Sequence, residues 1–151
     1  LFDVDHFKTF NDTRGHLAGD QLLSFIGALL RACTRGEGDR AVRYGGDEFI
    51  VILPGASIDQ GVAMSRRIRD LFGQYARTLK TNDTTPLPAI SVGVASLRTQ
   101  RPTTADELLN AADTAMYFAK HAEHGVATPE DVPPEGLPAD AIRRRREHAT
   151  S

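Results

Sequence analysis

A pair of glycines between two β-prone runs is the feature that most constrains the fold of this chain. Gly45 and Gly46 separate residues 41–44 from the apolar run 49–53. Tight turns between antiparallel strands need residues that adopt positive φ, and paired glycines supply them. The sequence therefore predicts a β-hairpin with Gly45-Gly46 as its turn. Five consecutive apolar residues in the second run predict a strand buried on both faces.

Apolar spacing predicts the remaining elements. Residues 19–33, 58–75 and a segment after 104 have helical spacing, and residues 1–5 and 89–97 are predicted strands. Alternation of Ile90, Val92 and Val94 indicates burial on one face of the last strand. Asp20 is expected near the start of the first helix, and residues 6–20 are expected to form turns. The order β-α-β-β-α-β-α indicates an α+β domain around one mixed sheet.

Composition excludes several classes of protein. The chain has 151 residues, a formal net charge of -2 and one cysteine, Cys33. The length suits one globular domain, the single cysteine excludes an internal disulfide framework, and the charge argues against bulk attraction to nucleic acid or anionic lipid. No apolar run approaches the roughly 18 residues of a membrane span. Four of the eight prolines and the arginines 143–146 lie after residue 125. We therefore expect residues 126–151 to be a disordered tail, with at most a short helix at 139–148.

Four carboxylates stand at predicted strand ends. Asp3 and Asp5 end the first strand, and Asp47 and Glu48 follow the glycine turn. If the two strands are neighbours, the four carboxylates converge and repel one another, so they need a cation nearby. Mg²⁺ is the cation that we expect. Solvated turn residues are an equally weighted alternative at this point.

Polar residues after the first strand suit phosphate. Lys8 is followed by Asn11, Asp12, Gly15 and His16. A lysine and free backbone amides beside an acidic metal site are what a nucleoside triphosphate needs. Alone, His16 is better explained as a surface residue, and Lys120 as a solvated helix end.

Several motifs in register identify a family resemblance. Asp3 to Lys8, Asn11-Asp12, Gly15-His16, Gly19-Asp20 and Arg43 to Phe49 closely resemble the GGDEF-domain family of diguanylate cyclases. Segments 91–95 and 112–120 continue the resemblance, which covers residues 1–125. It implies a palm-like nucleotidyl cyclase fold with a central, mostly antiparallel sheet flanked by helices. It also implies that the chain lacks the family's N-terminal helix and the start of its first strand.

The resemblance implies that two GTP molecules are condensed into cyclic di-GMP plus two pyrophosphates across a homodimer. It implies two Mg²⁺ ions per active site, for which Mn²⁺ can substitute, and an upstream sensory domain in a cytoplasmic, in some cases membrane-anchored, parent protein. Metal would be bound by Asp3, Asp47 and the Val4 carbonyl, with Glu48 as a further catalytic residue. Guanine would be read by Asn11 and Asp20, and phosphates held by Lys8, Lys120 and the amides near His6 and Phe7. Gly45 and Gly46 would leave room for the α-phosphate.

Two positions depart from the family pattern. The product-inhibition site keeps only Asp39, because Gly36 stands where the arginine is expected, so we predict that this site does not function. His124 stands where an arginine would grip the γ-phosphate.

Two alternatives to catalysis remain open at this stage. One is a GGDEF module that binds GTP or a partner protein without catalysis. The other, weaker, is a nucleic-acid binder using residues 143–146; no aromatic platform accompanies them, so nucleic acid is not an expected partner.

Overall fold

Five strands form one mixed sheet in the computed structural model, which describes residues 1–34, 37–80, 85–122 and 124–136. The strands are β1 (Phe2–Asp5), β2 (Arg40–Gly45), β3 (Glu48–Ile52), β4 (Ala89–Gly93) and β5 (Val126–Ala127), in the order β2-β3-β1-β4-β5. Every pairing is antiparallel except that of β4 with β5. The predicted α+β fold with a mixed, mostly antiparallel sheet is confirmed.

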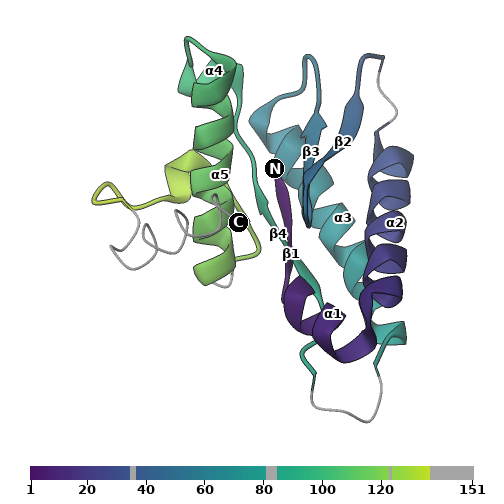
Figure 1. The fold of residues 1–151 in the computed structure, drawn as a ribbon. Helices are drawn as coiled ribbons and strands as arrows, with labels where there is room; N and C mark the ends of the chain where they lie inside the picture. The colour runs from purple at the N-terminus through teal and green to yellow at the C-terminus, as the bar shows by residue number, and fades with distance from the viewer. Residues whose placement is uncertain (35–36, 81–84, 123, 137–151) are drawn as a thin grey trace.

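Helices flank this sheet on both sides (Figure 1). They are α1 (Phe7–Arg14), α2 (His16–Cys33), α3 (Ile58–Thr78), α4 (Leu97–Gln100) and α5 (Ala105–His121), followed by the 3₁₀ turn η1 (Pro129–Asp131). α2 and α3 pack together on one face, and α5 lies on the other. Thr104 caps α5, because its side chain accepts a hydrogen bond from the Glu107 amide.

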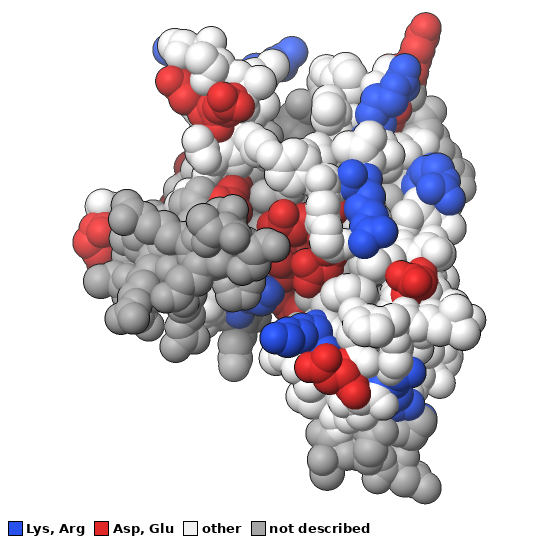
Figure 2. All heavy atoms as spheres, viewed as in Figure 1, with Lys and Arg blue, Asp and Glu red and all other residues white. Residues whose placement is uncertain are grey.

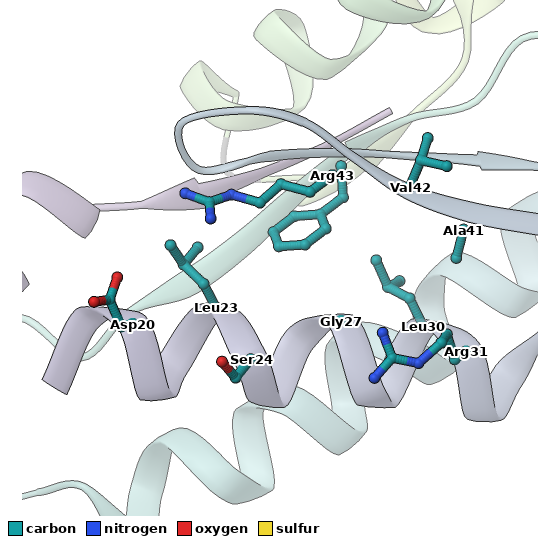
Figure 3. Close-up of a pocket in the computed structure, with 10 residues that line it drawn as sticks. Asp20, Leu23, Ser24, Gly27, Leu30, Arg31, Ala41, Val42 and Arg43 are labelled. Atoms are coloured by element: carbon teal, nitrogen blue, oxygen red, sulfur yellow. The ribbon is translucent and has the colours of Figure 1, made fainter. Parts of the chain in front are cut away.

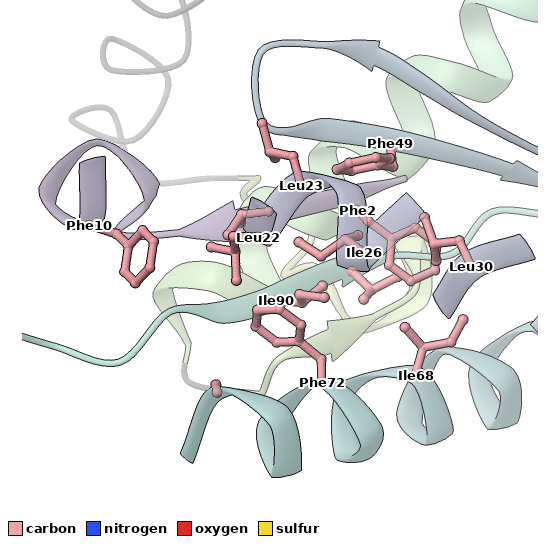
Figure 4. Packing of buried hydrophobic residues seen from close by; sticks show 13 residues of the cluster. Phe2, Phe10, Leu22, Leu23, Ile26, Leu30, Phe49, Ile68, Phe72 and Ile90 are labelled. Atoms are coloured by element: carbon pink, nitrogen blue, oxygen red, sulfur yellow. The ribbon is translucent and has the colours of Figure 1, made fainter. Parts of the chain in front are cut away.

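The main core lies between the sheet and helices α2 and α3 (Figure 4). In β1, Phe2 and Val4 are only 4% and 2% exposed, and they point into this core. Ile26 of α2 and Phe72 of α3 are fully buried against them. Burying each such side chain contributes about 1.5–3 kcal/mol. Because strand residues alternate in direction, Asp3 and Asp5 must face the opposite side of the sheet.

β4 corrects the prediction of a long strand buried on one face. It ends at Gly93, and Ser91 and Gly93 are buried as well as Ile90 and Val92. The reason is α5, which covers the second face so closely that a Cβ at Gly93 would lie 1.8 Å from the Ala112 carbonyl oxygen. Glycine at this position therefore allows α5 to approach the sheet.

The hairpin is present, with its turn displaced by one residue. Gly45 ends β2 opposite Glu48, after a register shift, and the turn residues are Gly46 and Asp47. Only Gly46 has the expected positive φ, of 50°. The prediction that β3 is buried on both faces is wrong. Ile52 is 54% exposed, because α5 does not extend over the hairpin on its side of the sheet.

The expectation of turns over residues 6–20 is also wrong. Residues Phe7–Arg14 form α1, and α2 begins at His16 rather than near Gly19. Asp20 is therefore not a cap but lies on the second turn of α2. A single buried side chain, Phe10, fixes α1 to the core, so the segment shows no apolar periodicity in sequence.

Regular structure continues past residue 125, into the stretch expected to be a disordered tail. Val126–Ala127 forms β5 beside β4, and Ala127 is buried against α5. A capped 3₁₀ turn follows at Pro129–Asp131. Two residues are too few to show a strand pattern, and their pairing depends on β4. The expected helix at 139–148 and the arginines 143–146 lie outside the described residues. Within the described residues, no helix is both long and apolar enough to cross a membrane.

Candidate functional site

The predicted carboxylates meet on the face of the sheet covered by α5. Asp3 of β1 lies directly opposite Glu48 of β3 on one side and Ser91 of β4 on the other. Directly opposite residues of antiparallel strands share a face, so these side chains are neighbours. Asp5 lies two residues further along the same face. Acidic atoms gather near the middle of the surface shown in Figure 2.

Lys120 connects α5 to this acidic face. Its ammonium forms an ion pair with Asp3 Oδ1 and lies 3.5 Å from Asp5 Oδ1. Ser91 Oγ donates a 2.8 Å hydrogen bond to the other oxygen of Asp5. Burial disfavours the lysine's charge, but the carboxylates of Asp3, Asp5 and Asp47 outweigh it and raise the pKa of Lys120. The ammonium is thus fixed in place and charged.

The carboxyl of Glu48 is repelled by the other acidic side chains of this cluster. Burial raises the pKa of its carboxyl, and the negative charges of Asp3, Asp113 and Asp47 raise it further, whereas Lys120 opposes the shift. These contributions bring Asp47 and Glu48, both predicted, into one electrostatic cluster with Asp3. They also add Asp113 of α5, which sequence reasoning did not select.

Arg43 fixes the hairpin turn that carries Asp47. Its guanidinium donates two hydrogen bonds to the Gly46 carbonyl oxygen, from Nε at 2.8 Å and from Nη2 at 2.6 Å. Two bonds that converge on one oxygen from a planar group restrict the orientation of both partners more than a single bond does. In the sequence, Arg43 stands out only as part of a motif, because its contact with Gly46 depends on the folded turn.

A groove of about 480 Å³ lies between α2 and the hairpin (Figure 3). Asp20 lies at one end, and the Arg43 side chain extends toward that end. Leu23 and Phe49 line the apolar floor. Asn11, the other predicted guanine residue, is not part of the lining; its side chain lies against Gly19, the neighbour of Asp20. A carboxylate above an apolar floor suits a flat ring with N–H donors.

The start of α1 holds three predicted phosphate residues. His6 has φ of 60° and precedes the helix, and no side chain caps the N-terminus. Free amides at a helix start attract anions. Lys8 is exposed on the first turn. This helix start follows Asp5 directly, so it lies at the same end of β1 as the carboxylates.

Cation chemistry fits the acidic cluster. Among the described residues, no group of three or more His, Cys, Asp or Glu side chains is placed to hold a metal on its own. Asp3 nevertheless pairs with a cation, the Lys120 ammonium, at the position where the resemblance implies a metal ligand. Val4 could supply only its carbonyl, because its side chain is in the core. Two carboxylates, one carbonyl and phosphate oxygens are a donor set that suits Mg²⁺.

Two predicted positions lie apart from this cluster. Asp39 precedes β2. It is next to Arg40, which pairs with Ile52 at the end of the hairpin opposite the turn. Its expected partner position, Gly36, lies outside the described residues. His124 packs on Phe118, with 5.7 Å between ring centroids. Its ring thus contacts α5 rather than any of the carboxylates described above.

Comparison with known proteins agrees with the residue-level picture. Residues 1–125 match the family described as "Diguanylate cyclase, GGDEF domain". Diguanylate cyclase A of Treponema denticola is 36% identical over 120 residues, covering 80% of this chain and 31% of that protein. The active GGEEF domain of a Vibrio cholerae diguanylate cyclase superposes with a TM-score of 0.71 at 25% identity, covering 84% of this chain and 78% of that one.

A second solved structure, the GGDEF domain of Caulobacter crescentus DgcB in complex with c-di-GMP, has a TM-score of 0.70 at 28% identity. It covers 86% of this chain and 75% of that chain. The chain spans less than a third of the length of the curated relatives it matches. Because the family match extends over most of the sequence, the chain belongs to the GGDEF-domain family of diguanylate cyclases.

Proposed function

We propose that this domain condenses two molecules of GTP into cyclic di-GMP and releases two pyrophosphates, with two copies of the domain facing each other. The observation that carries the proposal is the cluster of Asp3, Asp5 and Glu48 under Lys120, adjacent to the turn with Asp47. The carboxylates suit the metal ions that accompany a triphosphate, and the Lys120 ammonium and the uncapped start of α1 suit its phosphate oxygens.

Base recognition is assigned to the groove beside α2. The Asp20 carboxylate accepts hydrogen bonds from the N1–H and N2–H₂ donors of guanine, which adenine does not present in that pattern. Asn11 supplies a second polar contact. The triphosphate then extends toward the start of α1, where Lys8, the amides near His6 and Phe7, and Lys120 hold its oxygens.

Bond formation joins the two nucleotides. The ribose 3′-oxygen of one GTP attacks the α-phosphorus of the other, and the bond from that phosphorus to the pyrophosphate oxygen breaks. Glu48 is the proposed acceptor of the 3′-hydroxyl proton, because a carboxyl whose pKa is raised is a stronger base. Mg²⁺ held by Asp3, Asp47 and the Val4 carbonyl would neutralise charge on the phosphate oxygens. The same chemistry then closes the ring.

Binding without catalysis is the second candidate function. His124 favours it, since the family arginine is absent there and the histidine ring packs on Phe118. Losing one charged contact to phosphate weakens binding by about ten- to a hundredfold. A domain of this kind would bind GTP or a partner protein and form no cyclic di-GMP.

Chromatography of a reaction with GTP and Mg²⁺ separates the two candidates. Cyclic di-GMP should form with the wild-type chain and be absent with Asp47→Ala. Asp12→Ala, an exposed position on α1, is the matched control and should retain activity. GTP that is bound but recovered unchanged by folded, dimeric wild-type protein would reject the catalytic proposal in favour of the binding module.

A further inference from the structure

A positively charged side chain of the protein itself already occupies the carboxylates of β1. The Lys120 ammonium forms an ion pair with Asp3 Oδ1 and lies 3.5 Å from Asp5 Oδ1. Asp5 Oδ1 is buried and accepts no hydrogen bond within the described part of the chain, so the ammonium is the positive charge that the structure places beside it. Asp3 is also a proposed ligand of Mg²⁺. A metal ion bound to Asp3 would therefore have to come close to the ammonium.

Two cations on one carboxylate repel each other. Charges a few ångströms apart interact about four times more strongly near a protein surface than in bulk water, and a divalent ion doubles the effect. The side chains of Asp3 and Asp5 are only 14% and 13% exposed, so water screens little of this repulsion. The ammonium thus makes the binding of a free metal ion to Asp3 weaker than the carboxylates alone would make it.

A triphosphate removes this opposition. The Lys120 side chain is 36% exposed and belongs to the last turn of α5, so it can turn toward a ligand while the helix stays in place. Phosphate oxygens are strong acceptors for an ammonium. The uncapped start of α1, where the phosphates are proposed to lie, follows Asp5 almost directly. The ammonium therefore has a second anionic partner only when a nucleotide is bound.

We infer that Lys120 makes this site selective for a metal–triphosphate complex over a free metal ion, because its ammonium remains on Asp3 until phosphate oxygens take it over. The inference rests on the proposed function and deepens it. Holding phosphate is the role already proposed for Lys120, and keeping free metal away from Asp3 is the additional role. The two roles predict opposite effects of one substitution on the two ligands.

Lys120→Gln examines both roles in one variant. Glutamine keeps a hydrogen-bond donor for Asp3 and removes the charge. Lys120→Arg is the conservative variant, because it keeps the charge. Lys80→Gln is the matched control for net charge. Lys80 is exposed and follows α3, which packs on the face of the sheet opposite to α5 (Figure 1).

Mn²⁺ is the metal probe, because the electron paramagnetic resonance signal of the free ion measures binding without turnover. Without nucleotide, Lys120→Gln should bind Mn²⁺ about tenfold or more tightly than the wild-type chain, whereas Lys120→Arg and Lys80→Gln should stay close to wild type. At saturating Mn²⁺, Lys120→Gln should bind the α,β-methylene analogue of GTP about tenfold or more weakly. A general loss of structure would weaken both affinities.

The contrary outcomes separate this inference from the proposed function. Equal Mn²⁺ affinities in wild type and Lys120→Gln, with weaker analogue binding in the variant, would overturn the inference and leave the proposed function intact. The same conclusion follows if Lys80→Gln gains as much Mn²⁺ affinity. A wild-type chain that binds no analogue at saturating Mn²⁺ would reject the proposed function and the inference with it. If circular dichroism shows Lys120→Gln unfolded, Mn²⁺ must restore the fold by replacing the lost charge, and failure to do so would also reject the inference.

Discussion

Lys120 shows how single residues set the behaviour of the site. Its ammonium lies between Asp3 and Asp5, and together these groups leave Glu48 as the carboxyl whose charge is least compensated. An isolated buried carboxylate is expensive, whereas a paired one is tolerated. The site is therefore prepared for additional positive charge, and its members respond differently to pH.

Glu48 is expected to make the metal-free protein less stable as pH rises. Burial raises the pKa of this carboxyl above the ordinary 4.5, so its contribution is fully present below pH 4.5 and is lost as pH rises through the folded-state pKa. Glu48→Gln should therefore have the higher melting temperature at pH 7, with the difference vanishing below pH 4.5. Thermal melts in a chelating buffer at several pH values measure this.

Glu107 supplies the opposite control. Hydrogen bonds from Thr103 lower the pKa of its carboxyl, so its stabilising contribution is present above pH 4.5 and is lost as pH falls through the folded-state pKa. Glu107→Gln should thus show no gain in melting temperature at pH 7. Equal melting temperatures for wild type and Glu48→Gln at neutral pH would contradict the claim that the charge of Glu48 destabilises the metal-free protein.

Ser91 is expected to support Lys120 through Asp5. The serine is 2% exposed, and Ser91→Ala removes the only hydroxyl that donates to Asp5 Oδ2 among the described residues. An unsatisfied buried acceptor costs about 1–3 kcal/mol of unfolding free energy. We expect that loss in urea unfolding, together with weaker GTP binding measured by calorimetry. Ser65→Ala is the matched control, because the buried Ser65 hydroxyl donates to the Gly61 carbonyl within α3. This variant should leave GTP affinity unchanged, and an equal loss of affinity in both variants would refute a role for Asp5.

At the scale of elements, the hairpin between β2 and β3 delivers Asp47 to the cluster. Arg43→Lys should lower the rate of product formation more than the apparent KM for GTP, because one ammonium cannot replace two directed hydrogen bonds to Gly46. Arg40→Lys on the same strand is the control, since the Arg40 guanidinium donates a hydrogen bond to the neighbouring Asp39 carbonyl and not to the turn. Steady-state kinetics of both variants check this, and equal rates would show that the turn needs no such support.

Elements with strong local patterns could be predicted from sequence, and elements that depend on distant contacts could not. The predicted strand at residues 1–5 is present as β1, and the structure adds that Phe2 and Val4 lie on one face of it and Asp3 and Asp5 on the other. The α1 segment has one buried side chain, Phe10, with Phe7 partly buried against the same core, so its turn-forming residues hide the helix in the sequence. The sequence shows Ser91 and Arg43 only as members of motifs, and their contacts could not be predicted, because each acts through a partner that only the fold brings near.

At the scale of the whole molecule, α5 accounts for the main differences from expectation. It covers β4 and β5 but leaves Val42 and Ile52 of the hairpin exposed, so burial changes across one sheet. Its C-terminal turn places Lys120 over β1, and Ala119 packs with Ala127 of β5. The local periodicity of apolar residues predicts none of these contacts, because they depend on how the helices are layered on the sheet.

The most direct test of the central claim is the initial rate of cyclic di-GMP formation at saturating GTP and Mg²⁺, measured over a series of protein concentrations. Because catalysis is proposed to join nucleotides held by two copies, the rate should rise more steeply than in proportion to concentration. Two pyrophosphates should appear for each cyclic di-GMP, and Asp47→Ala should be inactive throughout. Unchanged GTP at concentrations where the wild-type chain is folded and dimeric, or equal product from Asp47→Ala, would contradict the account.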